Sequence, residues 1–386
     1  MDNEQLIKLT KWHMIAVGFW KFDDHYEKKS KIIHWLYTVY SKSVPVVYFV
    51  VLIGLSIESI KMCLQRDSLR RISEAVAVLH AVLDAVVKIF IFYNKKIPDL
   101  FSIVKKIETD IWKSNDFSIK NHYRRQITYC RLLCSVVMTL VFATGTSFTV
   151  AGFVKLSRKE IDINSFMYYL WLPFDKAPYQ TYLCVLYVIL CYNSVIFIVC
   201  VKIVLITLIV FVKTHFQILQ LKIKQLGSTQ HCVPLIKSLI QEHLFLIRYS
   251  EKLNDSVKYI LLLEYVLNSV NVASIIFQIL TIESLIDLLF PVVHSITITA
   301  EIFALAWTAT ELKEQSSMVS DAIYKSRWYN LERSTLRQLG IMMIRAQTPM
   351  VLTIGPFSPM TTNTAVAIMK AAYSYVMLVM NRYDHE

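Results

Sequence analysis

The chain has 386 residues, of which 55% are hydrophobic and 18% are charged, and its mean hydropathy is +0.45. A soluble domain is usually about 45–50% apolar and about 25% charged, so the composition excludes an ordinary soluble protein and predicts a polytopic membrane protein. Basic residues in membrane proteins usually lie beside anionic lipid. We therefore assign the net charge of +12 to contacts with membrane lipid and not to nucleic-acid binding.

The first 22 residues are not typical of a signal peptide. They begin with acidic residues, their apolar stretch at 12–20 is short, and no small-residue cleavage site follows. Trp12 and Trp20 flank this stretch. This pattern predicts a helix that lies at the membrane surface.

Seven apolar runs follow, each close to the roughly 20 residues that a membrane-spanning helix needs. With only 7 Gly and 9 Pro in the chain, we predict long helices and an all-α fold. The fourth run is about 52 Å long at a rise of 1.5 Å per residue, so it must tilt strongly or project out of the membrane. The predicted spans are about 43–60, 72–93, 130–154, 178–212, 259–281, 286–310 and 363–381.

The distribution of basic residues favours a cytoplasmic N-terminus and an extracellular C-terminus. Most of the 41 Lys and Arg residues lie in the segments that share a side with the N-terminus, as expected of cytoplasmic segments. Those segments are also much longer, so the density of basic residues does not by itself separate the two orientations.

The second run carries His80, Asp84 and Lys88 at a spacing of four residues, which puts them on one helical face. Ionisable groups at membrane depth are costly and often functional. We interpret Asp84 and Lys88 as an intrahelical pair pointing into the bundle; His80 in a ligand cavity and a proton relay are the alternatives. A stripe from Glu264 to Asn271 in the fifth run is typical of interhelical hydrogen bonding.

Aromatic and hydroxyl side chains recur in the outer halves of the third, fourth and sixth runs. An interfacial belt would explain them, but a mostly apolar pocket with a few hydrogen-bonding groups is also what a small volatile ligand needs. The residues predicted to contact such a ligand are His80, Thr146, Phe148, Tyr182, His294 and Thr297.

Motifs of catalysis and metal binding do not occur in the sequence. It lacks a His-Glu-x-x-His motif, a Gly-x-Ser-x-Gly motif and a phosphate-binding glycine loop. Most of the seven cysteines lie in apolar runs, where Cys behaves as a small hydrophobe. We expect neither an enzyme nor a cofactor or metal site.

The C-terminal third holds the most specific motifs. A basic amphipathic helix at 334–346 precedes a Pro, a turn follows at 355–359, and the last helix comes next. The region resembles the insect odorant receptor family over about 75 residues. The matching pieces are Glu311 to Ser317, Ala322-x-Tyr324, Trp328-Tyr329, Met342-x-x-Arg345-Ala346-Gln347-x-Pro349, Gly355 to Pro359 and Lys370-x-x-Tyr373-Ser374-Tyr375.

This resemblance implies an odorant-gated, non-selective cation channel, assembled as a hetero-tetramer with an odorant co-receptor. It implies binding of a small volatile odorant in the outer half of the bundle, a cytoplasmic anchor segment at 311–350, and a pore lined by the last helix. It also implies a multi-pass protein in the plasma membrane of olfactory sensory neurons. The motif residues expected in the anchor are Tyr324, Trp328, Arg345 and Gln347.

In the last helix we expect Ser374 and Leu378 to face the pore, with Leu378 as a hydrophobic constriction or, alternatively, as a packing residue. Arg382 would lie at the outer mouth, where a positive charge opposes cation entry. The short segment at 213–258 distinguishes the chain from the co-receptor and predicts a ligand-tuning subunit.

Three other classes of membrane protein fit the sequence less well. A gustatory-type channel usually ends in a Thr-Tyr pair followed by Gln-Phe, and neither occurs here. A G-protein-coupled receptor would carry Asp-Arg-Tyr and Asn-Pro-x-x-Tyr motifs, which are also missing. A transporter of small lipophilic molecules would show paired spans broken by Gly or Pro, whereas these spans are unbroken.

Overall fold

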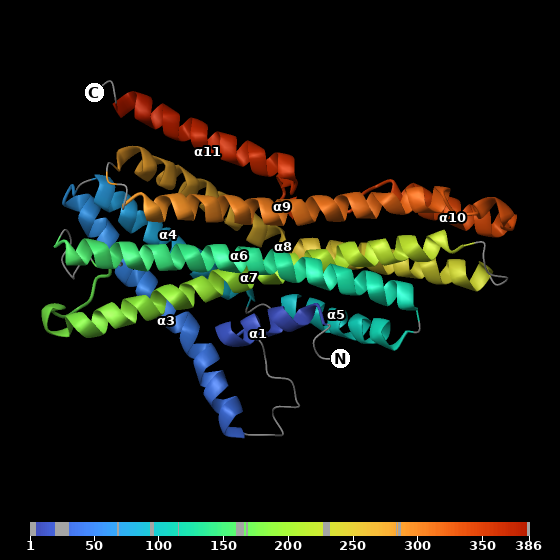
Figure 1. The fold of residues 1–386 in the computed structure, drawn as a ribbon, viewed down its shortest axis with the longest axis horizontal. Helices are drawn as coiled ribbons and strands as arrows, with labels where there is room; N and C mark the ends of the chain where they lie inside the picture. The colour runs from blue at the N-terminus through green and yellow to red at the C-terminus, as the bar shows by residue number, and fades with distance from the viewer. Residues whose placement is uncertain are drawn as a thin grey trace.

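The structure is a computed structural model and describes residues 5–19, 31–67, 69–92, 96–114, 116–159, 166, 169–226, 232–282, 284 and 287–383. Within them the chain is almost wholly helical, and most helices run roughly along the long axis of the molecule (Figure 1). The α-helices are α1 (Ile7–Val17), α3 (Lys31–Leu64), α4 (Leu69–Phe92), α5 (Lys96–Lys113), α6 (Phe117–Ser157), α7 (Gln180–Lys224), α8 (Cys232–Thr281), α9 (Leu289–Tyr324), α10 (Arg333–Ala346) and α11 (Thr362–Tyr383). The short elements are η3 (Ala177–Tyr179), η4 (Trp328–Asn330), β1 (Thr353–Ile354) and β2 (Ser358–Pro359).

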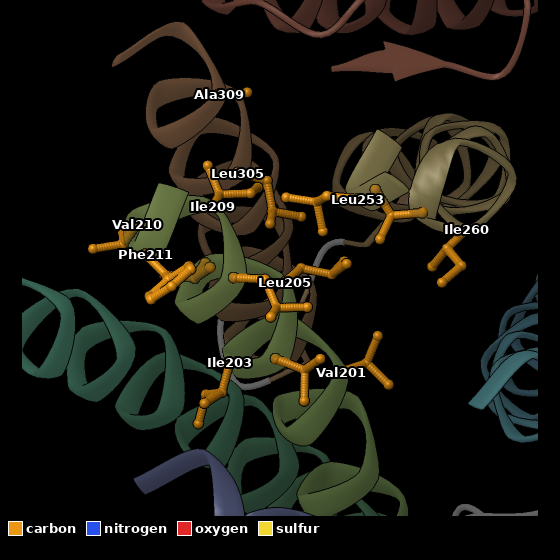
Figure 2. Packing of buried hydrophobic residues seen from close by; sticks show 14 of the residues in the cluster. Val201, Ile203, Leu205, Ile209, Val210, Phe211, Leu253, Ile260, Leu305 and Ala309 are labelled. Carbon is orange, nitrogen blue, oxygen red and sulfur yellow. The ribbon is translucent and has the colours of Figure 1, made fainter. Parts of the chain in front are cut away.

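α7 forms the centre of the bundle. It packs against α6, α8, α9 and α1, and every residue from Val199 to Phe216 is buried. Figure 2 shows side chains of this segment packed against Leu253 and Ile260 of α8 and against Leu305 of α9. A helix that is apolar all round must be surrounded by other elements, which explains why the most hydrophobic run of the sequence lies innermost.

Five helices within the described residues are long and apolar enough to cross a membrane: α3, α6, α7, α8 and α9. α4 and α11 coincide with the other two predicted spans. α3 begins well before the predicted start at residue 43, and Pro45 lies inside the helix and not near its beginning. The fourth run continues as one helix far beyond a bilayer's thickness, as the sequence predicts.

The helices α6, α7, α8 and α9 extend together towards the end of the molecule where α10 lies (Figure 1). α10 matches the predicted amphipathic helix; its apolar face, with Leu339 and Met342, is buried, and it packs mainly against α9. The helix ends at Ala346, shortly before Pro349, where a residue preceding Pro disfavours the α conformation.

A two-stranded hairpin, β1 paired antiparallel with β2, connects α10 to α11. Gly355 has a left-handed φ of 56°, and a Cβ there would come within 2.9 Å of Leu262 Cδ2, so both backbone and space favour glycine. The Asn254 side chain of α8 accepts a hydrogen bond from the Thr353 amide at 2.8 Å. These contacts fix where α11 starts.

The predicted N-terminal helix is α1. One side of this helix packs against the rest of the bundle, and the other side is exposed. Met14 and Val17 are buried, whereas Trp12 is exposed. Thr10 Oγ1 lies 2.8 Å from Thr207 Oγ1 of α7. α1 is therefore tied to the core helix of the bundle, and Trp20 lies outside the described residues.

Candidate functional site

A cavity of about 250 Å³ lies between α4, α6, α7, α8 and α9. Each helix contributes residues from successive turns. On α9 these turns run from Phe290 through His294 and Thr297 to Glu301, a length of about 16 Å at the α-helical rise. The cavity is therefore elongated along the bundle, in the direction of its helices.

One end of the cavity, which we term the ionic end, is closed by five charged residues from four helices. They are Asp84 and Lys88 of α4, Lys202 of α7, Glu264 of α8 and Glu301 of α9. The side chains of Lys88 and Glu264 are only 1% and 2% exposed. Charged groups this deeply buried persist only when they are paired.

Glu264 is the centre of the ionic end. Its carboxylate pairs with the ammonium groups of both Lys88 and Lys202. Lys202 Nζ also lies 3.4 Å from Glu301 Oε2. Asn268, one turn along α8, places its amide nitrogen 3.5 Å from Glu264. The ionic end thus links four helices through one connected set of contacts.

Asp84 also belongs to this set of contacts, but only one of its two carboxyl oxygens has a hydrogen-bond partner among the described residues. Its Oδ2 accepts a bond from Lys88, while its Oδ1 is buried and has no hydrogen-bond partner among the residues that the structure describes. With three carboxyl groups against two ammonium groups, the ionic end has an excess of acceptors. The predicted intrahelical pair of Asp84 and Lys88 is present, as one part of this larger network.

The other end, which we term the aromatic end, is lined by rings. Phe148 of α6 lies 5.0 Å from Phe290 of α9, centroid to centroid. Phe290 stacks on His294 at 5.4 Å, with the ring planes 13° apart. Nδ1 of His294 is buried without a hydrogen-bond partner among the described residues. This end offers flat apolar surfaces and a polar ring nitrogen, and Lys155 and Asp287 also belong to the lining near these rings.

A pair of threonines lines the middle of the cavity. Thr144 Oγ1 of α6 lies 2.7 Å from Thr297 Oγ1 of α9, and Thr297 also donates within α9 to Val293 O at 2.9 Å. Gly145 lets α6 approach α7 closely here, because a Cβ at this position would lie 2.6 Å from Val195 Cγ2. The wall is therefore rigidly packed.

Of the six residues predicted to bind ligand, Phe148, His294 and Thr297 line the cavity. His80, Thr146 and Tyr182 do not belong to its lining. His80 Nδ1 lies 3.2 Å from Val76 O in its own helix. Thr146 bonds to Phe142 O and lies 3.4 Å from the Tyr192 hydroxyl. Tyr182 is 77% exposed on the outside of α7.

The residues predicted for the pore lie on α11. This helix packs on α8 and α9 at one edge of the bundle (Figure 1). Its buried side includes Ala365 and Ala372, whereas Tyr373, Ser374 and Met377 are exposed. The helical backbone includes positions 378 and 382, but the side chains of Leu378 and Arg382 lie outside the described part of the structure.

The four predicted anchor residues lie around α10. Tyr324 and Trp328 are exposed, and Trp328 Nε1 donates to Tyr324 O at 3.2 Å. Arg345 donates to Thr348 O at 3.2 Å and lies 3.9 Å from Glu251. Gln347 is exposed at the C-terminal cap of α10. Ile341 and Ile344 are also exposed on α10, so this end presents uncovered apolar surface.

Two members of the ionic end, Lys202 and Glu301, did not stand out as site residues in the sequence. Each is an isolated charge in a long apolar run, and that isolation is the signal that could have found them. Among the described residues, no group of three or more His, Cys, Asp or Glu side chains is placed to hold a metal ion.

Comparison with known sequences identifies a family. The model of the family described as 7tm Odorant receptor matches residues 68–373. Odorant receptor 10 of Aedes albopictus is 31% identical over 146 residues, and Odorant receptor Or2 of Anopheles gambiae is 29% identical over 149 residues. These matches cover 38% and 39% of this chain and only 39% of each mosquito receptor. Putative odorant receptor 85d of Drosophila melanogaster is 21% identical over 98% of this chain and 94% of its own length.

Among solved structures, the insect olfactory receptor OR5 from Machilis hrabei in complex with eugenol matches with a TM-score of 0.82. The two chains are 18% identical, and the match covers 97% of each. At this identity the likeness shows the fold. The chain is accordingly a multi-pass, all-α membrane protein with the fold of the insect olfactory receptors.

Proposed function

Because the chain belongs to the 7tm Odorant receptor family, we propose that it is an odorant-binding subunit of a ligand-gated, non-selective cation channel. The observation that carries this proposal is the cavity between five helices, with the ionic end at one end and the rings of Phe148, Phe290 and His294 towards the other. Such a cavity suits a small organic molecule. The structurally similar receptor from Machilis hrabei binds eugenol, which supports a ligand of that size.

The bound ligand would act by favouring the open arrangement of the helices. A ligand shifts such an equilibrium only by binding one state more tightly than the other. α8 and α9 line the cavity and also hold α11. A rearrangement of these two helices around a ligand would therefore reach the helix that we propose lines the pore.

We place the N-terminus in the cytoplasm and the C-terminus outside, with the aromatic end of the cavity in the outer half. The distribution of basic residues supports this orientation. The exposed apolar residues around α10 support a role of this end in assembly, because uncovered apolar surface marks interaction sites. The partners would be co-receptor subunits in a hetero-tetramer.

A ligand-tuning role fits the sequence better than a co-receptor role. α7 and α8 are joined by residues 225–231 alone, without the long insertion expected of a co-receptor. Arg382 at the outer mouth would oppose cations, and four such charges in a homomeric ring would oppose them more than fewer charges in a heteromer. We expect the protein in the plasma membrane of olfactory sensory neurons.

The test is expression of the full chain in oocytes, alone and together with the odorant co-receptor, with current recorded against a panel of volatiles. We expect a cation current only when both subunits are present and only for some volatiles. A full-sized current from this chain alone would overturn the tuning role. Transport of a volatile without any current would instead support the transporter alternative.

A further inference from the structure

We propose that the ligand of this cavity carries a hydrogen-bond-donating head group, a hydroxyl or an amine, which binds Asp84 at the ionic end. Its apolar body would lie along the cavity towards the rings of Phe148 and Phe290. The inference rests on the proposed function, because it names the chemical class of ligand for the same cavity.

The first reason is that the ionic end includes an acceptor to which the described residues donate no hydrogen bond. Lys88 and Lys202 are both engaged by Glu264, and Lys202 also contacts Glu301. Oδ1 of Asp84 is buried and receives no hydrogen bond from the described residues, although Asp84 borders the cavity. A buried acceptor without a donor is costly, and hydrogen bonds to charged groups are the stronger ones. A donor on the ligand therefore gains more here than in water.

The second reason is the balance of charge. Three carboxyl groups face two ammonium groups at the ionic end. A ligand carboxylate would bring another negative group into a site of low dielectric, where like charges repel strongly. A hydrocarbon would avoid repulsion but would give no donor to Oδ1 of Asp84. The structure thus ranks alcohols and amines above hydrocarbons, and hydrocarbons above acids.

The third reason is reach. The cavity extends over about 16 Å between the two ends, and its middle is lined by apolar side chains such as Val141 and Ile298. A single ring or a six-carbon chain with its head at Asp84 would place its apolar body in this middle part of the cavity, directed towards the aromatic end. The rival polar groups towards the aromatic end are His294 Nδ1, Lys155 and Asp287. A head bound to any of them would not depend on Asp84.

The test is a series of matched ligands on the full chain co-expressed with the co-receptor. The phenyl series is 2-phenylethanol, 2-phenylethylamine, propylbenzene and 3-phenylpropanoate; the alkyl series is hexan-1-ol, hexylamine, heptane and heptanoate. If no compound of either series activates the channel, the strongest agonist of the odorant panel is used. It is compared with the analogue in which a methyl group replaces its hydrogen-bond-donating head group. We expect the donor compound to be roughly tenfold or more potent than its hydrocarbon analogue, and the acid to be weakest.

A hydrocarbon or an acid as potent as its alcohol, or a strongest agonist without a donor, would overturn the inference and leave the proposed function standing. The absence of current for every volatile would instead count against the proposed function. Asp84→Asn should reduce the potency ratio of donor to hydrocarbon several-fold, because a charged acceptor is stronger than a neutral one. Asp255→Asn, at an exposed position of α8, should leave the ratio unchanged.

An unchanged ratio in Asp84→Asn at normal surface abundance would show that the head binds elsewhere, with His294 as the next position to test. If this variant fails to reach the surface, the wild-type series decides by itself, since it needs no substitution.

Discussion

Removal of Lys202 tests whether the ionic end holds the bundle together. In Lys202→Met the side chain stays unbranched, is one atom shorter and loses its charge. Glu264 keeps its ion pair with Lys88. Glu301 loses its ion pair with Lys202, which is its only ion pair among the described residues. One ammonium group then faces three carboxyl groups.

The structure sets the size of the effect. Breaking a buried ion pair by removing one partner typically costs about 3–5 kcal/mol, because it leaves an unpaired buried charge. Lys202 and Glu264 are each 2% exposed, so solvent cannot replace the lost partner. A second change, Glu301→Gln, removes the carboxylate that Lys202→Met leaves alone. The double variant should be more stable than Lys202→Met, with a coupling energy of roughly 1–3 kcal/mol.

Unfolding of the purified protein can be followed with a thiol-reactive fluorescent dye. Cys130, Cys134, Cys191 and Cys200 are buried and become reactive only as the bundle opens. Lys202→Met should unfold several degrees below the wild type, and Glu301→Gln should recover part of the loss. Lys258→Met, at a surface pair with Asp255, is the matched control and should unfold like the wild type. Equal unfolding of wild type and Lys202→Met, with zero coupling to Glu301, would refute the reasoning.

Three further predictions concern other parts of the chain. Gly145→Ala should destabilise the bundle by about 1–3 kcal/mol, because its Cβ would lie 2.6 Å from Val195 Cγ2; adding Val195→Ala should restore thermal stability, and no rescue would contradict this contact. Burial raises the pKa of Glu108, which accepts bonds from the Leu6 amide and the Tyr123 hydroxyl. Its ionisation therefore costs stability as the pH rises above the ordinary pKa of 4.5. The melting temperature of Glu108→Gln, relative to that of the wild type, should therefore increase from acidic to neutral pH. A difference in melting temperature that stays constant over this range would contradict the prediction. Leu378→Ala should change the leak or the conductance of the co-expressed channel, and unaltered currents would remove this residue from the pore.

The helices of this fold follow from the sequence because their signals are local. Apolar runs of sufficient length predict spanning helices, and the Pro after α10 and the glycine of the hairpin punctuate the C-terminal third. The full extent of α3 does not follow from the predicted span at 43–60, which has Pro45 near its start. A neighbouring helix can hold a membrane helix together around a proline, and α3 packs along α4.

The site is less predictable because it depends on which face of each helix meets which neighbour. Tyr182 and Phe148 looked alike in the sequence, yet one is exposed on α7 and the other lines the cavity. α7 is apolar in nearly all directions, so no stripe of polar residues reveals its inward face. Lys202 and Glu301 meet only because α7 and α9 pack side by side, and no local pattern contains that information.

The most direct test of the central claim is whether an odorant occupies this cavity when it activates the channel. Ala151 lines the cavity, whereas Ala143, two turns earlier on α6, is exposed on the outside. Cysteine is introduced at each position in the co-expressed channel, and its modification by a membrane-permeable thiol reagent is timed with and without the strongest agonist. We predict that the agonist slows modification at position 151 and not at 143. Equal rates at position 151 with and without agonist would contradict the assignment of this cavity as the odorant site.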